Sequence, residues 1–495
     1  MESGMHQAFS ILMVSTLVSL ALNFVTIHVA KSRGWLSGVD FRRKKRRRVP
    51  LLGGVPSYLA VGMAGYVFHL SDLKIVLLAG LPLILTGAVD DVRELKAKQK
   101  LAGQLLAVAL WFYVIPSESL LLSKLGVWEP LAIGISAFWM LGIINALNMI
   151  DGMDSEAAGF SMIVCGFFVL LFGLSGPGLS SLAVMGGCMG FLFFNWPPAR
   201  IYLGDSGSTF LGFFLAAMGA TLPIPLVTPA WHFLLVPLFL LALPEMDALL
   251  SIARRIRSRT SLMKGDHDHV HHKLMKLGFK VPQALAVLFI ATAYCGLTAL
   301  ILRHLDEPLM VLGVIALSMT GLLVVLGSVY LMEYKQARQV SSYSQTLIAQ
   351  NLPIKNNVIL DAESFRSVVY DLMPYYKELQ QRGIVRVQEF IQDFSEFIKC
   401  HHPNGQLKMI GAYSIIVVES PKSKSISVRD AIIADFYQLV ASHRVQKNDN
   451  GDPWGVSFYS DDQRGQQFMK KFGFEVGSQK ATENTQQLDS TGTDS

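Results

Sequence analysis

Residues 131–154 read LAIGISAFWMLGIINALNMIDGMD, and this stretch decides the class of the protein. Its first part, 131–149, is almost entirely apolar, and a helix needs about 20 mostly apolar residues to cross a bilayer. Amide and acid side chains gather at its end, at Asn145, Asn148, Asp151 and Asp154. The stretch therefore predicts a membrane helix with a cluster of polar groups at one end.

The composition of the whole chain agrees with this interpretation. Of its 495 residues, 51% are hydrophobic and only 16% are charged, whereas soluble domains carry roughly 25% charged residues. The mean hydropathy is +0.40. The four cysteines show no paired spacing, and three lie in apolar runs, so that disulfides and zinc knuckles are not expected. An average soluble enzyme is excluded.

Ten further apolar stretches accompany the first. They lie at 8–30, 51–70, 73–89, 101–116, 159–175, 179–195, 208–223, 230–248, 282–303 and 309–332. The earliest one has no basic region before it and is followed by ten others, which argues against a cleaved signal peptide. We predict an all-α polytopic membrane domain with about eleven transmembrane helices over residues 1–333.

The loops between these stretches differ strongly in their content of Lys and Arg. The loops at 31–49, 90–100, 150–158, 196–207 and 251–281 hold 22 basic residues, and the opposite loops hold only Lys74, Lys124 and Arg303. Basic residues collect in cytoplasmic loops. We therefore predict that the N-terminus lies outside and the C-terminus inside the cell.

The C-terminal third differs from the preceding residues in its composition and in its pattern of apolar residues. We predict a juxtamembrane linker at 334–356, a cytoplasmic accessory domain of α/β or α+β type at 357–477, and a disordered polar tail at 478–495. Helix-like patterns occupy 365–379, 387–398 and 431–444, and strand-like runs occupy 407–418 and 455–459. Residues 334–495 hold 18 basic and 18 acidic side chains, so the net charge of +6 belongs to the membrane part. A nucleic-acid partner is not expected.

Acid, amide and histidine side chains gather on the predicted cytoplasmic face. They are Asp90, Asp91, Asn145, Asn148, Asp151, Asp154, Asp205, Asp247, Asp266, Asp268, His269, His271 and His272. Any one of them could be a solvated helix end, and Gly204–Gly207 alone could cap a helix. Five loops that supply such groups to one face indicate a phosphate-bearing substrate, because carboxylate and amide oxygens bind Mg²⁺, and Lys100 and Arg200 could neutralise phosphate charge.

The order of these motifs resembles that of a known family, the polyprenyl-phosphate N-acetylhexosamine-1-phosphate transferases (the WecA-like branch of the MraY superfamily). The matching segments are Pro50–Gly54, Asp90–Leu95 with Lys100 and Gln104, Asn145–Asp154, Phe194–Ser208 (including Asn195), Pro244–Asp247 and Asp266–Leu274. The His269, His271 and His272 pattern is similar to that of the WecA-type enzymes.

The resemblance implies a reaction and its participants. A HexNAc-1-phosphate, most simply GlcNAc-1-phosphate, would pass from a UDP-sugar to undecaprenyl phosphate with release of UMP, as the first lipid-linked step of a surface polysaccharide. It implies Mg²⁺ (or Mn²⁺) at Asp205 and Asn148. Catalytic roles would fall to Asp90, Asp91, Lys100, Asp151 and Asp154, and substrate contacts to Asn145, Asn195, Arg200, Asp266, His269, His271 and His272. The enzyme would lie in a bacterial inner membrane with a cytoplasmic active site.

The sequence departs from the family pattern at two positions beside the expected site. Ser155 and Glu156 stand where the family prefers Gly and Leu, and Glu156 adds a charge beside the expected site. A phospho-MurNAc-pentapeptide or a rarer UDP-sugar is the alternative substrate. A transporter would carry ionisable residues near the membrane midplane, where the predicted spans have few. The resemblance leaves room for a homodimer and for a protein partner bound by 334–495. Within that segment, 465–475 is similar to the closing helix and strand of an acyl-CoA N-acetyltransferase.

Overall fold

The computed structural model describes residues 2–33, 49–93, 95–223, 231–257, 269–305, 307–351, 359–361, 366–371, 384–402, 406–410, 414–419, 435, 438, 456–460 and 475–477. The chain divides into two compact units, Met1–Tyr330 and Leu331–Ser495.

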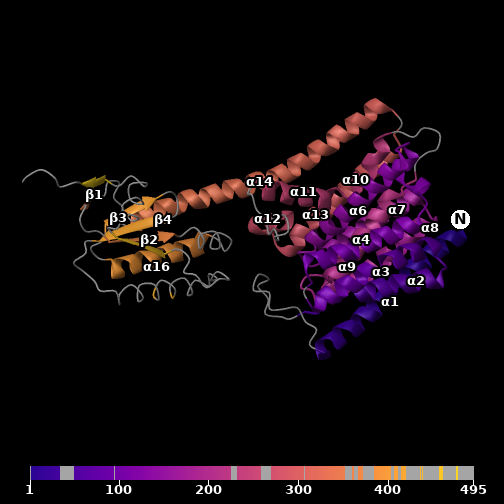
Figure 1. Ribbon diagram of the computed structural model, residues 1–495, viewed down its shortest axis with the longest axis horizontal. Helices are drawn as coiled ribbons and strands as arrows, with labels where there is room; N and C mark the ends of the chain where they lie inside the picture. Colours follow the sequence, from indigo (N-terminus) through magenta and orange to yellow (C-terminus); the bar gives the residue numbers. More distant parts are fainter. Residues whose placement is uncertain are drawn as a thin grey trace, which may run out of the picture. The chain divides into compact units, whose positions relative to one another are not determined.

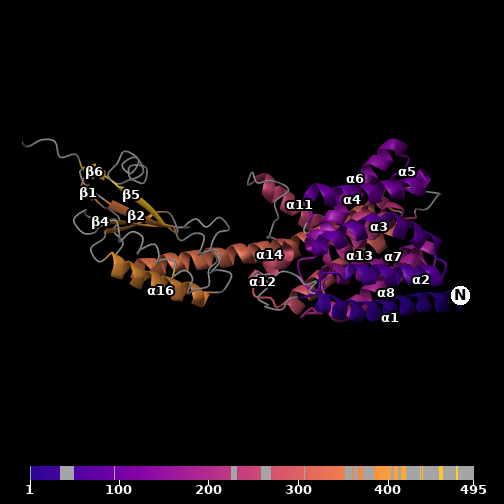
Figure 2. The ribbon, with the colours of Figure 1, turned by 60° about the horizontal axis from the view of Figure 1, so that its bottom comes forward.

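The first unit is a bundle of helices (Figure 1). Its long helices are α1 (Glu2–Arg33), α2 (Gly54–Val67), α3 (Ser71–Val92), α4 (Ala97–Val114), α6 (Glu129–Ile150), α7 (Glu156–Phe172), α8 (Gly176–Asn195), α9 (Gly204–Ala220), α11 (Ala242–Arg257), α13 (Val281–Arg303) and α14 (Pro308–Asn351). Shorter pieces are η1 (Ser117–Ser119), α5 (Leu121–Lys124), η2 (Trp231–Leu234), α10 (Leu235–Leu240) and α12 (Val270–Lys276). Each of the eleven predicted apolar stretches overlaps one or more helices in its described residues. The N-terminus and α12 lie at opposite ends of this unit in both ribbon views (Figures 1 and 2).

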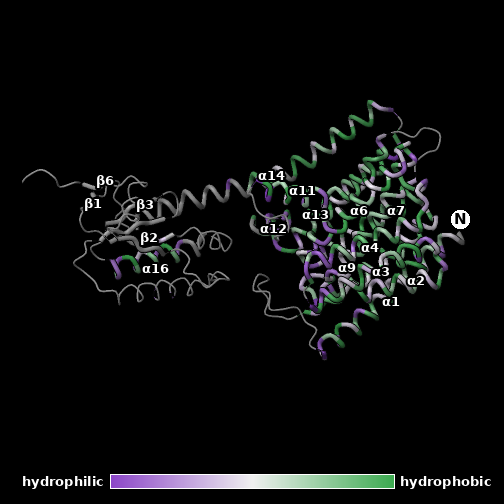
Figure 3. Tube along the Cα trace, viewed as in Figure 1, coloured by the Kyte–Doolittle hydropathy of each residue, from purple (hydrophilic) through white to green (hydrophobic). Residues whose placement is uncertain are grey.

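The helical, polytopic character of the first unit is confirmed. Within the described residues, six helices are long and apolar enough to cross a membrane, namely α1, α3, α6, α8, α13 and the first part of α14. The bent pair of η2–α10 and α11 brings the number to seven. Helices α2, α7 and α9 are shorter, with 14, 17 and 17 residues. The tube of this unit is hydrophobic along most of its helices, and hydrophilic residues lie at their ends (Figure 3).

The expectation of one continuous span at 230–248 is wrong. The chain bends by 82° between the segments Trp231–Leu240 and Ala242–Arg257. Pro244 has no backbone N–H to donate and would disrupt a continuous helix, but it is tolerated in the first turn of a new one. The chain therefore begins α11 at Ala242.

Helix α9 forms the centre of the bundle. Every residue from Ser206 to Ala220 is buried, and a helix that is apolar on all sides belongs in a core. It packs against α2, α3, α6 and α7. The polar start of α9, with Asp205 in its first turn, is thereby surrounded by the ends of neighbouring helices.

The second unit combines a sheet with a helix. Strands β3 (Gln406–Ile410), β4 (Ser414–Glu419), β2 (Arg366–Asp371) and β5 (Val456–Ser460) form an antiparallel sheet in that order, and β1 (Ile359–Asp361) pairs in parallel with β6 (Glu475–Gly477). Helix α16 (Ile384–His401) packs on the sheet through Tyr370 of β2, whose ring meets those of Phe394 and Phe397 edge-on. The buried Tyr370 hydroxyl also lies 2.7 Å from Nε2 of His402. Figure 2 shows α16 beside these strands.

Two expectations for this unit are wrong in detail. The helix expected at 365–379 gives way to β2 over Arg366–Asp371, because its adjacent valines and tyrosine favour a strand. The run at 407–418 forms two strands, β3 and β4, that pair with Ile410 opposite Ser414.

Helix α16 and strand β5 lie where we expect a helix and a strand. Most of the expected linker is helical, since α14 continues to Asn351. The helix expected at 431–444, apart from residues 435 and 438, and the polar tail at 478–495 lie outside the described residues.

Candidate active site

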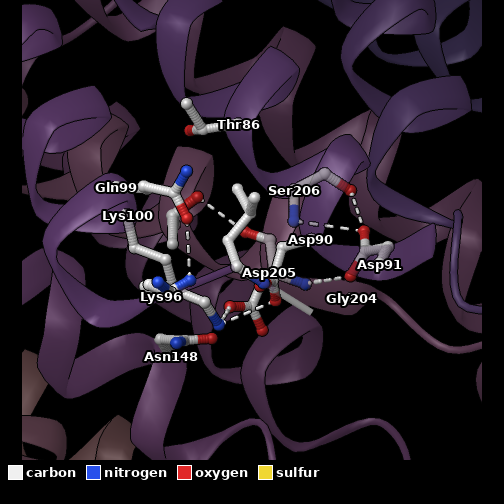
Figure 4. A network of polar contacts seen from close by, with 12 residues as sticks. Thr86, Asp90, Asp91, Lys96, Gln99, Lys100, Asn148, Gly204, Asp205 and Ser206 are labelled. Carbon is white, nitrogen blue, oxygen red and sulfur yellow. Dashed lines mark hydrogen bonds and ion pairs between the residues drawn. The ribbon is translucent and has the colours of Figure 1, made fainter. Parts of the chain in front are cut away.

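Two carboxylates and one amine form the centre of the polar face (Figure 4). Nζ of Lys100 lies 2.7 Å from Oδ2 of Asp90 and 2.7 Å from Oδ2 of Asp205. The three side chains come from the end of α3, the first turn of α4 and the first turn of α9. The Lys100 and Asp205 side chains are 33% and 26% exposed, so that a ligand can reach this cluster. We call these three residues the acid–lysine cluster.

The electrostatics of the cluster keep Lys100 charged. Partial burial by itself lowers the pKa of the Lys100 amine, but the hydrogen bonds and charges of Asp205 and Asp90 outweigh this effect and raise that pKa above its usual value. The Lys100 side chain is therefore an ammonium ion at neutral pH. It supplies a positive charge at the point where two carboxylates meet.

Asp91, the neighbour of Asp90, has a different role. Its carboxylate accepts hydrogen bonds from the backbone N–H of Asp205 (2.8 Å) and of Ser206 (3.3 Å) and from the Ser206 hydroxyl (2.7 Å). The two backbone N–H groups belong to the first turn of α9, where N–H groups have no partner within the helix. Gly204 has a φ of +76° and lies against this carboxylate, so that a larger residue would be strained there. Asp91 thus caps α9 and fixes the position of Asp205.

The amides of α6 face the same helix ends. Oδ1 of Asn148 accepts a hydrogen bond of 2.7 Å from the Ser208 hydroxyl, and Ser208 lies one turn after Asp205 on α9. Asn148 is therefore close to the acid–lysine cluster, as the close view in Figure 4 also shows. One turn earlier on α6, Asn145 and Gln104 exchange amide hydrogen bonds of 3.0 and 3.1 Å.

The turn between α6 and α7 is held by the loop that precedes α9. Oδ2 of Asp154 accepts a hydrogen bond of 3.1 Å from the backbone of Ala199. Asn195 is buried; its side-chain oxygen accepts from the Ser155 N–H at 2.7 Å and its amide donates to the carbonyl of Ile201. Asn195 therefore positions this turn, and a direct contact with substrate would require these bonds to break. Asp151 follows α6 at its C-terminal end.

The three histidines divide into two buried rings and one that is partly accessible. Nδ1 of His269 lies 2.7 Å from Oδ2 of Asp247, and Nδ1 of His271 lies 3.1 Å from Oε2 of Glu156. Their side chains are 7% and 1% exposed, whereas His272 is only half-buried. The rings of His271 and His272 are 4.2 Å apart.

Two further predicted residues, Arg200 and Asp266, have no contact with the acid–lysine cluster that the structure describes. Arg200 lies on the loop after α8, and its guanidinium is 5.3 Å from the ring centre of Phe194. Asp266 falls outside the described residues. The Pro50–Gly54 motif, by contrast, does reach the site, because Gly53 and Gly54 donate backbone hydrogen bonds to the carbonyls of Tyr202 and Leu203.

Several contacts of the site were not predicted from sequence. Nothing in the linear pattern paired Glu156 with His271 or Asp247 with His269, although Asp247 belongs to a matching motif and Glu156 is a departure from the family pattern. Nor did the adjacent pair Asp90 and Asp91 reveal which carboxylate faces Lys100.

The oxygen atoms around Asp205 suit a divalent metal ion. Two carboxylates already converge on one cation, the Lys100 ammonium, and the Asn148 amide is close by. In the part of the chain that the structure describes, no three His, Cys, Asp or Glu side chains are grouped as ligands of a metal ion. Mg²⁺ is commonly bound by one or two carboxylates together with water and substrate phosphates. The residues present therefore fit an open metal site completed by a phosphate.

A bundle of apolar helices with a partly exposed acid–lysine cluster at the helix ends is typical of a membrane protein with a binding site for charged groups. The sequence profile of glycosyl transferase family 4 matches residues 73–222. Those residues include Asp90, Lys100 and Asp205.

Individual relatives agree with this family. A decaprenyl-phosphate N-acetylglucosaminephosphotransferase of Mycobacterium leprae is 30% identical over 319 residues, which cover 56% of this chain and 80% of the relative. An enzyme of the same name from Mycolicibacterium smegmatis is 30% identical and covers 54% and 75%. The undecaprenyl-phosphate alpha-N-acetylglucosaminyl 1-phosphate transferase of Escherichia coli K12 is 28% identical and covers 57% and 82%. The chain belongs to glycosyl transferase family 4 and is a transferase, as its motifs predict.

Proposed function

We propose that this protein transfers a HexNAc-1-phosphate, namely GlcNAc-1-phosphate, from its UDP-sugar to undecaprenyl phosphate, with release of UMP. The observation that carries this proposal is the acid–lysine cluster, in which a charged Lys100 lies 2.7 Å from both Asp90 and Asp205 and remains partly exposed at the helix ends. The names of the relatives support the same reaction and the same sugar.

The chemistry assigned to the cluster is phosphoryl transfer. A phosphate oxygen of the lipid attacks the β-phosphorus of the UDP-sugar, the bond to the UMP oxygen breaks, and a lipid diphospho-sugar forms. Such reactions gain mainly from positioning and from neutralisation of charge. The Lys100 ammonium neutralises charge on the phosphates. Asp90 orients the lipid phosphate; since the second pKa of a phosphate is about 6, no strong general base is needed at neutral pH.

Asp205, with Asn148, would hold Mg²⁺ or Mn²⁺. A bound divalent ion supplies positive charge to the pyrophosphate oxygens. Asp91 contributes indirectly, because it caps α9 and thereby holds Asp205 in place. The two adjacent aspartates therefore have different roles: Asp90 contacts the lipid phosphate, and Asp91 has a structural role.

The surrounding groups form the nucleotide and sugar sites. Asp151 and Asp154, on the turn after α6, shape the nucleotide site together with Asn145. His272 contacts the pyrophosphate or the sugar from the histidine loop, and its partial exposure supports this role. Arg200 and Asp266 complete the predicted set of substrate contacts.

The same proposal extends to topology and location. The chain crosses a bacterial inner membrane about eleven times over residues 1–333, with the bent pair of η2–α10 and α11 as one broken span. The N-terminus lies outside and the active site on the cytoplasmic face. The distribution of 22 against three basic residues in the loops supports this orientation, as does the position of the N-terminus opposite α12 (Figure 1). Residues 357–477 form a cytoplasmic accessory domain. The product enters the synthesis of a surface polysaccharide such as O-antigen.

A panel of radiolabelled UDP-sugars tests this proposal. Purified protein in lipid nanodiscs is mixed with undecaprenyl phosphate, Mg²⁺ and UDP-GlcNAc, UDP-GalNAc or UDP-MurNAc-pentapeptide, and label in the lipid extract is followed together with UMP. We expect lipid-linked product and equal release of UMP with UDP-GlcNAc. Product only from the pentapeptide would correct the substrate, and no product from any UDP-sugar would overturn the proposed reaction.

A further inference from the structure

A buried acid–base pair joins two loops of the candidate site. Oε2 of Glu156, in the first turn of α7, lies 3.1 Å from Nδ1 of His271, and the two side chains are only 3% and 1% exposed. A buried carboxylate is costly unless a partner compensates its charge. The pair is therefore specified by the fold and does not form by accident on a surface.

The other side of the His271 ring lies against Gly152. A methyl group added at Gly152 would meet Nε2 of His271 at 2.7 Å, so that only glycine allows the ring to approach this closely. Gly152 lies between Asp151 and Asp154. The His271 ring is thus placed between the turn after α6 and the first turn of α7, and it fixes the histidine loop to that turn.

The neighbouring histidine has a similar anchor on another helix. Asp247 of α11 contacts Nδ1 of His269 at 2.7 Å and accepts the backbone N–H of Val270 at 3.0 Å. Two carboxylates from two helices therefore hold the first and second histidines. His272, which is half-buried and whose ring lies 4.2 Å from that of His271, is left as the histidine that a substrate can reach.

We propose that Glu156 is a positioning residue that acts through His271 and sets the place of His272 in the sugar-nucleotide site. Glu156 is one of the two positions, with Ser155, at which this sequence departs from the pattern that its motifs resemble. The inference rests on the proposed function, because it assigns the positioned histidine to the UDP-sugar.

Kinetics of Glu156→Gln test this role. Glutamine keeps the size of the side chain but cannot become a carboxylate. We expect the KM for UDP-GlcNAc to rise about tenfold, as for other residues that orient a ligand-binding side chain, with little change in kcat because the acid–lysine cluster is intact. A merely structural role would reduce the amount of folded enzyme and leave KM unchanged. Glu156→Leu, which has the residue of the family pattern, replaces this variant if Glu156→Gln does not fold.

A double-variant cycle shows whether the effect passes through His271. In a His271→Gln background, Glu156→Gln should change KM no further, because the contact is already lost. Independent, additive effects of the two substitutions would overturn the proposal. Glu129→Gln is the matched control: Glu129 also lies in the first turn of a helix, but it accepts from Ser117 and is exposed. It should leave KM unchanged.

Chemical modification gives a readout that does not depend on activity. Diethyl pyrocarbonate acylates accessible imidazoles, and mass spectrometry locates the product. In the wild type we expect His272 to react and His271 to be protected; in Glu156→Gln, His271 should react about tenfold faster, because the local structure opens more readily. An equal rate at His271 in both proteins would overturn the positioning role. If the wild type transfers no sugar phosphate while this protection still depends on Glu156, the proposed function fails and the positioning role is retained.

Discussion

Two networks that pair carboxylates with basic side chains lie in the first unit, and they differ in burial. In the acid–lysine cluster, the Lys100 and Asp205 side chains are 33% and 26% exposed. In the histidine network, Glu156 and His271 are 3% and 1% exposed, and Asp247 and His269 are similarly buried. Both networks pair carboxylates with basic side chains, but the first is more accessible to a ligand than the second.

The difference follows from the cost of breaking each type of pair. An exposed ion pair contributes about 0–1 kcal/mol, because water solvates both groups when they separate. Removal of one member of a buried pair costs roughly 3–5 kcal/mol, because the other charge is left without compensation. The acid–lysine cluster is therefore suited to binding phosphates and a metal ion, and the histidine network to holding its loops in place.

The largest effect is expected from Asp205→Asn, which removes a charge from the exchangeable network. We expect the transfer rate at saturating Mg²⁺ to fall about a thousandfold, as for the loss of a group that stabilises transition-state charge. Asp72→Asn, in the first turn of α3 and hence at the opposite end of that helix from Asp90, is the control and should keep the wild-type rate. A rate within a few-fold of wild type for Asp205→Asn would remove Asp205 from the metal site.

Lys100→Ala should have the next largest effect. Its amine compensates two carboxylates in the structure and phosphates in the reaction, so we expect the rate to fall about a hundredfold. The thermal unfolding midpoint should change little, because the pair is partly exposed. Lys98→Ala, on an exposed position of the same helical turn, is the matched control. Unchanged kinetics in Lys100→Ala would place this residue outside the site.

Asp91→Asn tests whether Asp91 stabilises α9 as its cap or takes part in the reaction. Loss of a helix cap costs about 1–2 kcal/mol, so we expect a lower unfolding midpoint by differential scanning fluorimetry and a rate that falls less than in Asp205→Asn. Asp90→Asn should show the reverse, a strong loss of rate with a nearly normal midpoint. If Asp91→Asn unfolds like the wild type and is inactive, Asp91 contacts the substrate directly.

The smallest effect is expected from removal of the second unit. Truncation after Gln339 deletes most of Leu331–Ser495, which forms a compact unit of its own. Because all residues assigned to catalysis lie in the first unit, the transfer rate in vitro should remain within about twofold of wild type. Loss of transfer in a truncated protein that still unfolds cooperatively would show that the second unit takes part in the reaction.

Much of the acid–lysine cluster could be predicted from sequence. The residues Asp90, Lys100 and Asp205 follow or precede apolar stretches that end on one side of the predicted membrane, so their proximity follows from the order of the spans. The choice between Asp90 and Asp91 could not be predicted, because adjacent residues on a helix point about 100° apart and the rotation of α3 about its axis depends on its packing against α9.

The histidine network was less accessible to sequence analysis. Glu156 and His271 are 115 positions apart, and their pairing depends on how α7 and α12 pack around the turn at Gly152. The histidine pattern predicted a loop of substrate contacts, whereas two of its rings are buried against acids. Hydropathy alone also does not predict whether a segment forms one straight helix or a bent pair, as before α11. Nor does it decide between a helix and a strand, as at Arg366–Asp371.

The most direct test of the account follows the β-phosphorus of the sugar nucleotide. Wild-type protein and Asp205→Asn are incubated with undecaprenyl phosphate, Mg²⁺ and UDP-GlcNAc radiolabelled at the β-phosphorus, and the lipid and water phases are separated. We predict that the wild type moves the label into the lipid phase with one UMP released for each label transferred, and that Asp205→Asn does not. Label that remains in the water phase as UDP while the sugar reaches the lipid, or equal transfer by both proteins, would contradict the account.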